Sequence, residues 1–127
     1  YDGILENIPF VHESGACAMI HSDSDSGIQR LNQEVAKSWA HGNRAGLNIK
    51  KEEAWTWLTS NPAKALGILD QTGTLETGKR ADIIIWSADP FITYSRPEKV
   101  FLDGQLLYDK NNNIYPRSDF RLGYGVK

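Results

Sequence analysis

The sequence predicts a mixed fold of the α/β to α+β class, with a helical first part and a β-rich second part. Up to residue 68, apolar residues recur at helical spacing around one short, wholly apolar run. Beyond residue 68 the pattern changes to short runs of period two, separated by glycines. We therefore expect two parts, 1–68 and 69–127. A chain of 127 residues with 40% hydrophobic residues can bury a core without disulfides.

The first part opens with a predicted helix and a predicted buried strand. Apolar residues at helical spacing indicate a helix that starts near Asn7 and is capped by Gly15. The five apolar residues 16–20 are too few for a helix and are typical of a strand covered on both faces of a parallel sheet. Cys17 is in this run, so we expect a buried, inert thiol.

Three further helical stretches complete the first part. One extends from residue 28 to about His41 and is closed by Gly42. Another begins near Lys50, and a short helix over 61–66 is capped by Gly67. The apolar positions of the two longer stretches are Ile28, Leu31, Val35, Trp39, Ala54, Trp55 and Leu58.

The second part reads as antiparallel sheet. Strands are expected at 81–87, 99–102 and 105–108, and the last two are joined by Asp103-Gly104, a two-residue hairpin signal. Residues 114–115 would add a short final strand, and 117–127 would form an extended tail.

Charge and hydropathy exclude two classes of partner. The formal net charge is −2, so no basic field is available to hold nucleic acid or an anionic membrane surface. The longest apolar run, 83–86, is far shorter than the roughly 20 residues of a membrane-spanning helix. The sequence leaves the cellular compartment open.

One polar loop, 21–25, is a candidate site because it follows the predicted buried strand and precedes a long helix. Sites in parallel α/β folds lie at such strand ends. Asp23 could ligate a cation and accept a proton from metal-bound water, and His21 could be a second ligand. The same serines and aspartates also suit a solvated loop or a helix cap, for which Asp25 and Ser26 are the candidates.

The other candidate side chains have structural explanations. His12 is expected to be a surface or hydrogen-bonded histidine, and His41 to interact with the dipole of a helix end. Tryptophans at 39, 55, 57 and 86 fall on helix or strand faces, where core packing is the ordinary role.

Four motifs follow one another from residue 60 onward. They are Ser60-Asn61-Pro62-Ala63, Gly78-Lys79-Arg80-Ala81-Asp82, Asp89-Pro90-Phe91 and Val100-Phe101-Leu102-Asp103-Gly104. Together they resemble the C-terminal region of metal-dependent amidohydrolases of the imidazolonepropionase and dihydroorotase type. The motif glycines and prolines suit turns and helix ends, and Asp82 is expected to bond the turn before its strand.

The resemblance implies a fold and a role for one residue. It implies that 1–68 is the last helix-strand-helix part of a (β/α)₈ barrel, and that 69–127 is the C-terminal share of a small β-sandwich. Residues 18–23 resemble the eighth barrel strand, so Asp23 matches the family's metal-ligating aspartate and general base. The remaining ligands of that family would precede Tyr1, and we therefore expect a fragment truncated at its N-terminus.

Two functional hypotheses follow. In the first, the chain is the C-terminal part of a hydrolase that uses a divalent metal, zinc by expectation, to cleave C–N bonds of small amides, cyclic amides or amidines. The isolated chain would then be inactive, because one carboxylate cannot replace about three protein ligands. In the second, it is a noncatalytic, self-associating module. We expect a homo-oligomer in either case, because the 16–20 strand would be an unpaired edge.

Overall fold

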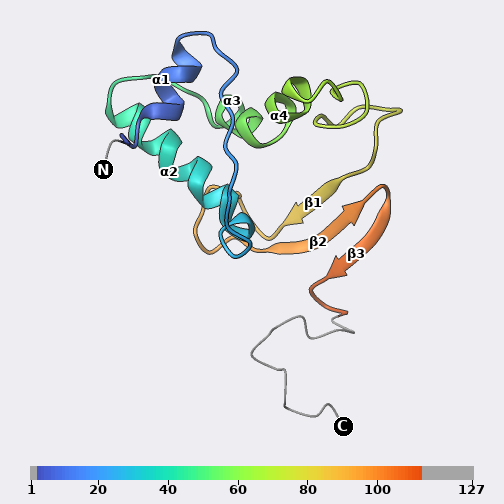
Figure 1. Ribbon diagram of the computed structural model, residues 1–127. Helices are drawn as coiled ribbons and strands as arrows, with labels where there is room; N and C mark the ends of the chain where they lie inside the picture. Colours follow the sequence, from blue (N-terminus) through green and yellow to red (C-terminus); the bar gives the residue numbers. More distant parts are fainter. Residues whose placement is uncertain (1–2, 113–127) are drawn as a thin grey trace.

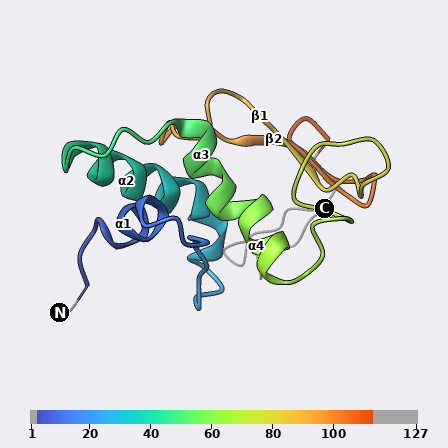
Figure 2. The ribbon, with the colours of Figure 1, turned by 90° about the horizontal axis from the view of Figure 1, so that it is seen from above.

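A computed structural model describes residues 3–112 as a group of helices followed by a small antiparallel sheet (Figure 1). This arrangement confirms the mixed helix and strand class. The helical elements are α1 Asn7–Glu13, the 3₁₀ helix η1 Ile28–Arg30, α2 Leu31–Arg44, α3 Lys51–Trp55, the 3₁₀ helix η2 Thr56–Leu58 and α4 Ser60–Ala65. The strands are β1 Ile83–Trp86, β2 Pro97–Leu102 and β3 Gln105–Asp109. Seen from above, the helices gather on one side and the sheet on the other (Figure 2).

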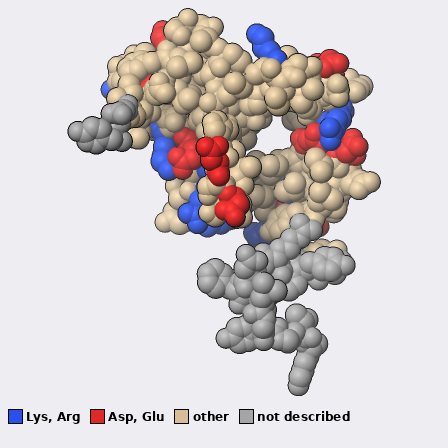
Figure 3. All heavy atoms as spheres, viewed as in Figure 1, with Lys and Arg blue, Asp and Glu red and all other residues tan. Residues whose placement is uncertain are grey.

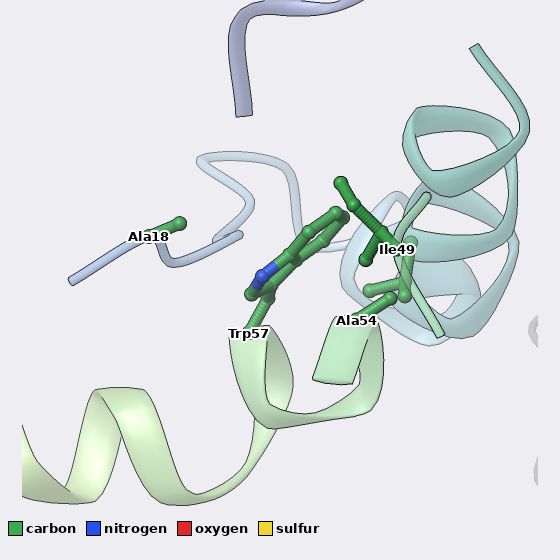
Figure 4. Packing of buried hydrophobic residues seen from close by; sticks show 5 residues of the cluster. Ala18, Ile49, Ala54 and Trp57 are labelled. Atoms are coloured by element: carbon green, nitrogen blue, oxygen red, sulfur yellow. The ribbon is translucent and has the colours of Figure 1, made fainter. Parts of the chain in front are cut away.

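Trp57 is the centre of the helical core. Its side chain is fully buried, and the indole ring lies between Ala18 on one side and Ile49 and Ala54 on the other (Figure 4). The indole N–H donates to His12 Nδ1 at 3.3 Å, so the polar edge of the ring is also satisfied. His12 is thus a hydrogen-bonded histidine, as the sequence predicts.

The close packing of α1 on α2 depends on Gly42. A Cβ atom built on Gly42 would lie 2.5 Å from Cβ of Pro9, a buried residue of α1. The prediction that Gly42 ends the helix is therefore wrong. α2 continues to Arg44, and Gly46, with φ of 95°, follows its end.

Residues 16–20 do not form the predicted strand. In this run only Ala18 is buried, and Cys17 is exposed, so the predicted buried thiol is also wrong. A parallel strand needs neighbouring strands, and residues 3–112 place none beside this segment. The segment is held instead by single contacts: Ile20 N–H donates to the Trp57 carbonyl, and Asn61 Nδ2 donates to the Ala18 carbonyl.

The sheet is a three-stranded antiparallel meander in the order β1-β2-β3. Asp103 and Gly104 have φ of 51° and 78°, which confirms the two-residue hairpin between β2 and β3. The strand expected at 114–115 and the tail expected at 117–127 lie outside the described residues.

Asp82 ties together three turns beside the start of β1. Its Oδ1 accepts from the Asp103 N–H at 2.8 Å, and its Oδ2 accepts from Thr72 Oγ1 at 3.1 Å. The Arg80 guanidinium lies 3.7 Å from Oδ2. The hydrogen bond from the Asp103 N–H is the largest cause that lowers the pKa of Asp82; burial opposes it as the next largest effect, and Thr72 and Arg80 lower the pKa further by smaller amounts.

We expect this carboxylate to link stability to pH. A pKa that is lower in the folded state than the unfolded value of about 3.9 stabilises the fold above that value, and the stabilisation is lost as pH falls through the folded pKa. Urea unfolding over a pH series should therefore show a weaker acid loss of stability for Asp82→Asn than for the wild type. Asp70→Asn, at an exposed carboxylate, is the control. An unchanged acid slope in Asp82→Asn would contradict this role.

A groove separates the two halves of the molecule (Figure 3). It holds about 740 Å³ of open volume and is mostly apolar. Its walls include Trp55, Leu58, Ala63 and Leu66 on the helical side and Ile84 and Trp86 on the sheet. In the described residues, no helix lies close enough to a strand for their backbones to pack. Side-chain contacts connect the halves instead: Trp86 of β1 meets Trp55 of α3, and Phe91 of the loop between β1 and β2 packs on the helices.

Candidate functional site

Loop 21–27 is a compact turn that leads into η1 and then α2. Ser22 Oγ accepts from the Ser24 N–H at 3.1 Å, and Ser24 Oγ accepts from the Gly27 N–H at 3.0 Å. A Cβ on Gly27 would lie 3.0 Å from Ser22 Oγ, so the turn closes tightly at a glycine. The polar residues of this loop thus fold it on itself.

The predicted cap at Asp25 or Ser26 is not formed. Asp25 Oδ1 accepts only from the N–H of its neighbour Ser26, at 2.8 Å, and neither η1 nor α2 has a side-chain cap. Ser24 occupies the capping role for this turn instead, because its carbonyl also accepts from the Ile28 N–H at 3.0 Å.

Asp23 points away from the body of the loop into solvent. Its side chain is 97% exposed, and its Oδ1 lies 3.4 Å from Nδ1 of His21, which is 82% exposed. The two side chains that the sequence singled out are therefore neighbours on one surface. Both present polar atoms outward, where a partner or another part of a longer chain could reach them.

The described residues do not by themselves make a metal site. Structural and catalytic zinc sites use three or four protein ligands, and within 3–112 no three His, Cys, Asp or Glu side chains converge. His21 and Asp23 supply two donors at most. An imidazole nitrogen and a carboxylate oxygen suit a borderline cation such as zinc, but the further ligands would have to come from outside residues 3–112.

His41 and Cys17 do not add to this surface. His41 is in the last turn of α2, and its Nδ1 lies 3.6 Å from Glu6 Oε1. Cys17 Sγ contacts the Asn61 carbonyl at 3.7 Å.

Within 3–112, no helix is long and apolar enough to span a bilayer.

Comparison with known proteins decides the family. The amidohydrolase family model matches residues 5–107. This chain belongs to the amidohydrolase family. The family resemblance inferred from the four motifs is thereby confirmed, and the match extends from α1 to β3.

A solved amidohydrolase shares the fold. The crystal structure of an amidohydrolase from Thermotoga maritima MSB8 matches with a TM-score of 0.71 and 29% sequence identity. The match covers 84% of this chain and 26% of the Thermotoga chain. This amidohydrolase chain thus spans about a quarter of the length of the solved structure that it matches.

The sequence reasoning missed the contacts of Lys51. Its ammonium pairs with Asp89 and lies 5.5 Å from the ring centroids of both Trp39 and Phe91. The only sequence feature that pointed to this contact was the Asp89-Pro90-Phe91 motif. It marked the turn, but it gave no indication that a lysine 38 residues earlier would meet it.

Proposed function

We propose that this chain supplies one aspartate, Asp23, to the catalytic centre of a longer hydrolase that cleaves C–N bonds. The observation that carries the proposal is the placement of Asp23: a carboxylate almost fully exposed, on a tightly bonded loop, in a chain of the amidohydrolase family. The 26% coverage of the Thermotoga structure supports a longer protein. We propose that 1–68 contributes to its barrel and 69–127 to its β-sandwich.

The proposed chemistry is hydrolysis of a small amide, cyclic amide or amidine. Asp23 would occupy one ligand position of a divalent metal, with zinc as the first candidate and the remaining ligands outside this chain. Such a metal supplies activated water when bound. The part of Asp23 is to accept a proton at its carboxylate and pass it to the leaving nitrogen.

The proposal predicts a clear difference between the isolated chain and the complete gene product. We expect the complete gene product to bind stoichiometric metal, to hydrolyse a member of a panel of small amides and cyclic amides, and to lose activity to a chelator. The 127-residue chain with added zinc should neither bind the metal tightly nor hydrolyse a member of the panel, because the metal-ligand side chains within 3–112 are too few. Metal analysis by mass spectrometry and an amide hydrolysis assay measure both. Tight zinc binding with hydrolysis by the isolated chain would contradict the proposal.

We also propose that the isolated chain self-associates. The 16–20 strand no longer supports this expectation, but the sheet does, because five of its large apolar side chains are close to half exposed. They are Ile84, Ile85, Leu102, Leu106 and Leu107. Light scattering coupled to size-exclusion chromatography should find a dimer or a larger assembly. A monomer at every concentration tested would contradict self-association.

A further inference from the structure

The turn Asp89-Pro90-Phe91 in the loop between β1 and β2 reaches into the helical half. In Figure 1 this loop, drawn in gold, passes beside the end of α2 at which the helix begins. The Phe91 ring lies edge-on to Trp39 of α2, with ring centroids 5.5 Å apart, and 5.8 Å from the Trp55 ring of α3. Phe91 therefore joins two helices to the sheet.

An ion pair fixes the same turn from the side of α3. Lys51, the first residue of α3, pairs with Asp89 Oδ2, while Asp89 Oδ1 accepts from the Phe91 N–H at 2.9 Å. The hydrogen bond from Lys51, and then the one from the Phe91 N–H, lower the pKa of Asp89. The Lys51 ammonium also lies over the aromatic rings of Trp39 and Phe91, which favours the cation at this position.

Asn32 connects this turn to the start of α2. Its side chain is in the first turn of α2 and is 7% exposed, one of two buried polar residues in the described part of the chain. Nδ2 donates to the Pro90 carbonyl at 2.8 Å. A buried amide is costly without a partner, so the hydrogen bond ties the helix start to the loop of the sheet half. α2 is the helix into which the Asp23 loop leads through η1.

We propose that Asn32 is a positioning residue for Asp23: it anchors the first turn of α2 to the Pro90 carbonyl, and so fixes the loop that carries the aspartate. This inference rests on the proposed role of Asp23. Catalytic groups are sensitive to such anchoring, because a misplacement of about 1 Å can cost about 100-fold in rate. Lys51 acts less directly. Its ion pair with Asp89 holds the turn whose Pro90 carbonyl accepts the hydrogen bond from Asn32.

The test uses the complete gene product and compares substitutions that break the anchor with one that breaks a hydrogen bond elsewhere. Asn32→Leu keeps the size of the side chain and removes the donor, and Lys51→Met removes the charge and keeps the stem. Each should lower kcat by about tenfold while KM changes little, at a temperature where the variant is fully folded. The loss of kcat in the double variant should be smaller than the product of the two single losses, because both substitutions act through the same turn.

Thr72→Val is the matched control. It removes the hydrogen bond to Asp82 at the other end of the β half, so it costs stability without touching the Pro90 turn. Its kcat should stay at the wild-type value. If Asp23→Asn is inactive while Asn32→Leu and Lys51→Met both keep wild-type kcat, the positioning role is wrong and the proposed function stands. If Asn32→Leu does not fold, Lys51→Met alone decides the positioning role in the same way. If Asp23→Asn stays active, the proposed function itself is wrong.

Discussion

Replacement of Asp23 by asparagine in the complete gene product is expected to lower kcat by about a thousandfold. Asparagine keeps the shape of the side chain but removes the negative charge and cannot accept the proton. The fold should be unaffected, because the Asp23 side chain is 97% exposed and lies beside His21, which is itself 82% exposed. Steady-state kinetics, with the melting temperature measured on the same samples, separate a chemical loss from a structural one.

Asp25→Asn is the matched control in the same loop. Its carboxylate bonds only the N–H of the next residue, so removal of its charge should leave kcat unchanged. Equal losses in the two variants would mean that the loop acts through its overall charge. Wild-type turnover in Asp23→Asn would remove the role that we assign to this residue.

Replacement of Trp57 by alanine is expected to lower the free energy of unfolding by about 3–5 kcal/mol. The side chain is fully buried at the meeting point of Ala18, Ile49 and Ala54, and its N–H donates to His12. The substitution leaves a cavity, and it also leaves His12 Nδ1 without its donor. Urea unfolding of the 127-residue chain, followed by circular dichroism, measures the change.

Tyr94→Ala provides the comparison for an aromatic residue at the surface. Tyr94 is 86% exposed, so its removal should change the free energy of unfolding by no more than about 0.5 kcal/mol. A loss below about 1 kcal/mol in Trp57→Ala would show that the helical core does not depend on this ring.

The features that the sequence predicted correctly are those set by local chemistry. Asp103-Gly104 specifies its hairpin because both positions need positive φ, and Gly67, with φ of 72°, follows α4 for the same reason. In both cases the deciding residues are at the turn or helix end itself, so the pattern alone was sufficient. Asp82 differs, because its main partner is the Asp103 N–H of the hairpin 21 residues later and not the turn before its own strand.

The features that the sequence did not predict depend on distant partners. Residues 16–20 have the composition of a buried strand, but no strand in 3–112 pairs with them. Gly42 reads as a helix end, yet its absent side chain makes room for Pro9 of another helix. The Lys51–Asp89 pair and the Asn32–Pro90 hydrogen bond join residues 38 and 58 positions apart. Periodicity and motif spacing carry no information about such contacts.

The candidate site was predictable only in part. The residues alone placed His21 and Asp23 on a loop before a helix, and the structure brings the two side chains within 3.4 Å. The choice of Asp23 over Asp25 came from the family resemblance, because both aspartates are equally suited to a polar loop. Asn32 gave no signal in the sequence, since its role depends on a carbonyl of the β half.

The most direct test of the account is the distance from Asp23 to a bound metal in the complete gene product. A crystal structure with anomalous data collected at the zinc edge measures it. We predict a metal peak about 2.0–2.2 Å from an Asp23 carboxylate oxygen, the usual range for a zinc ligand. A fully occupied metal site that Asp23 does not ligate would contradict the account.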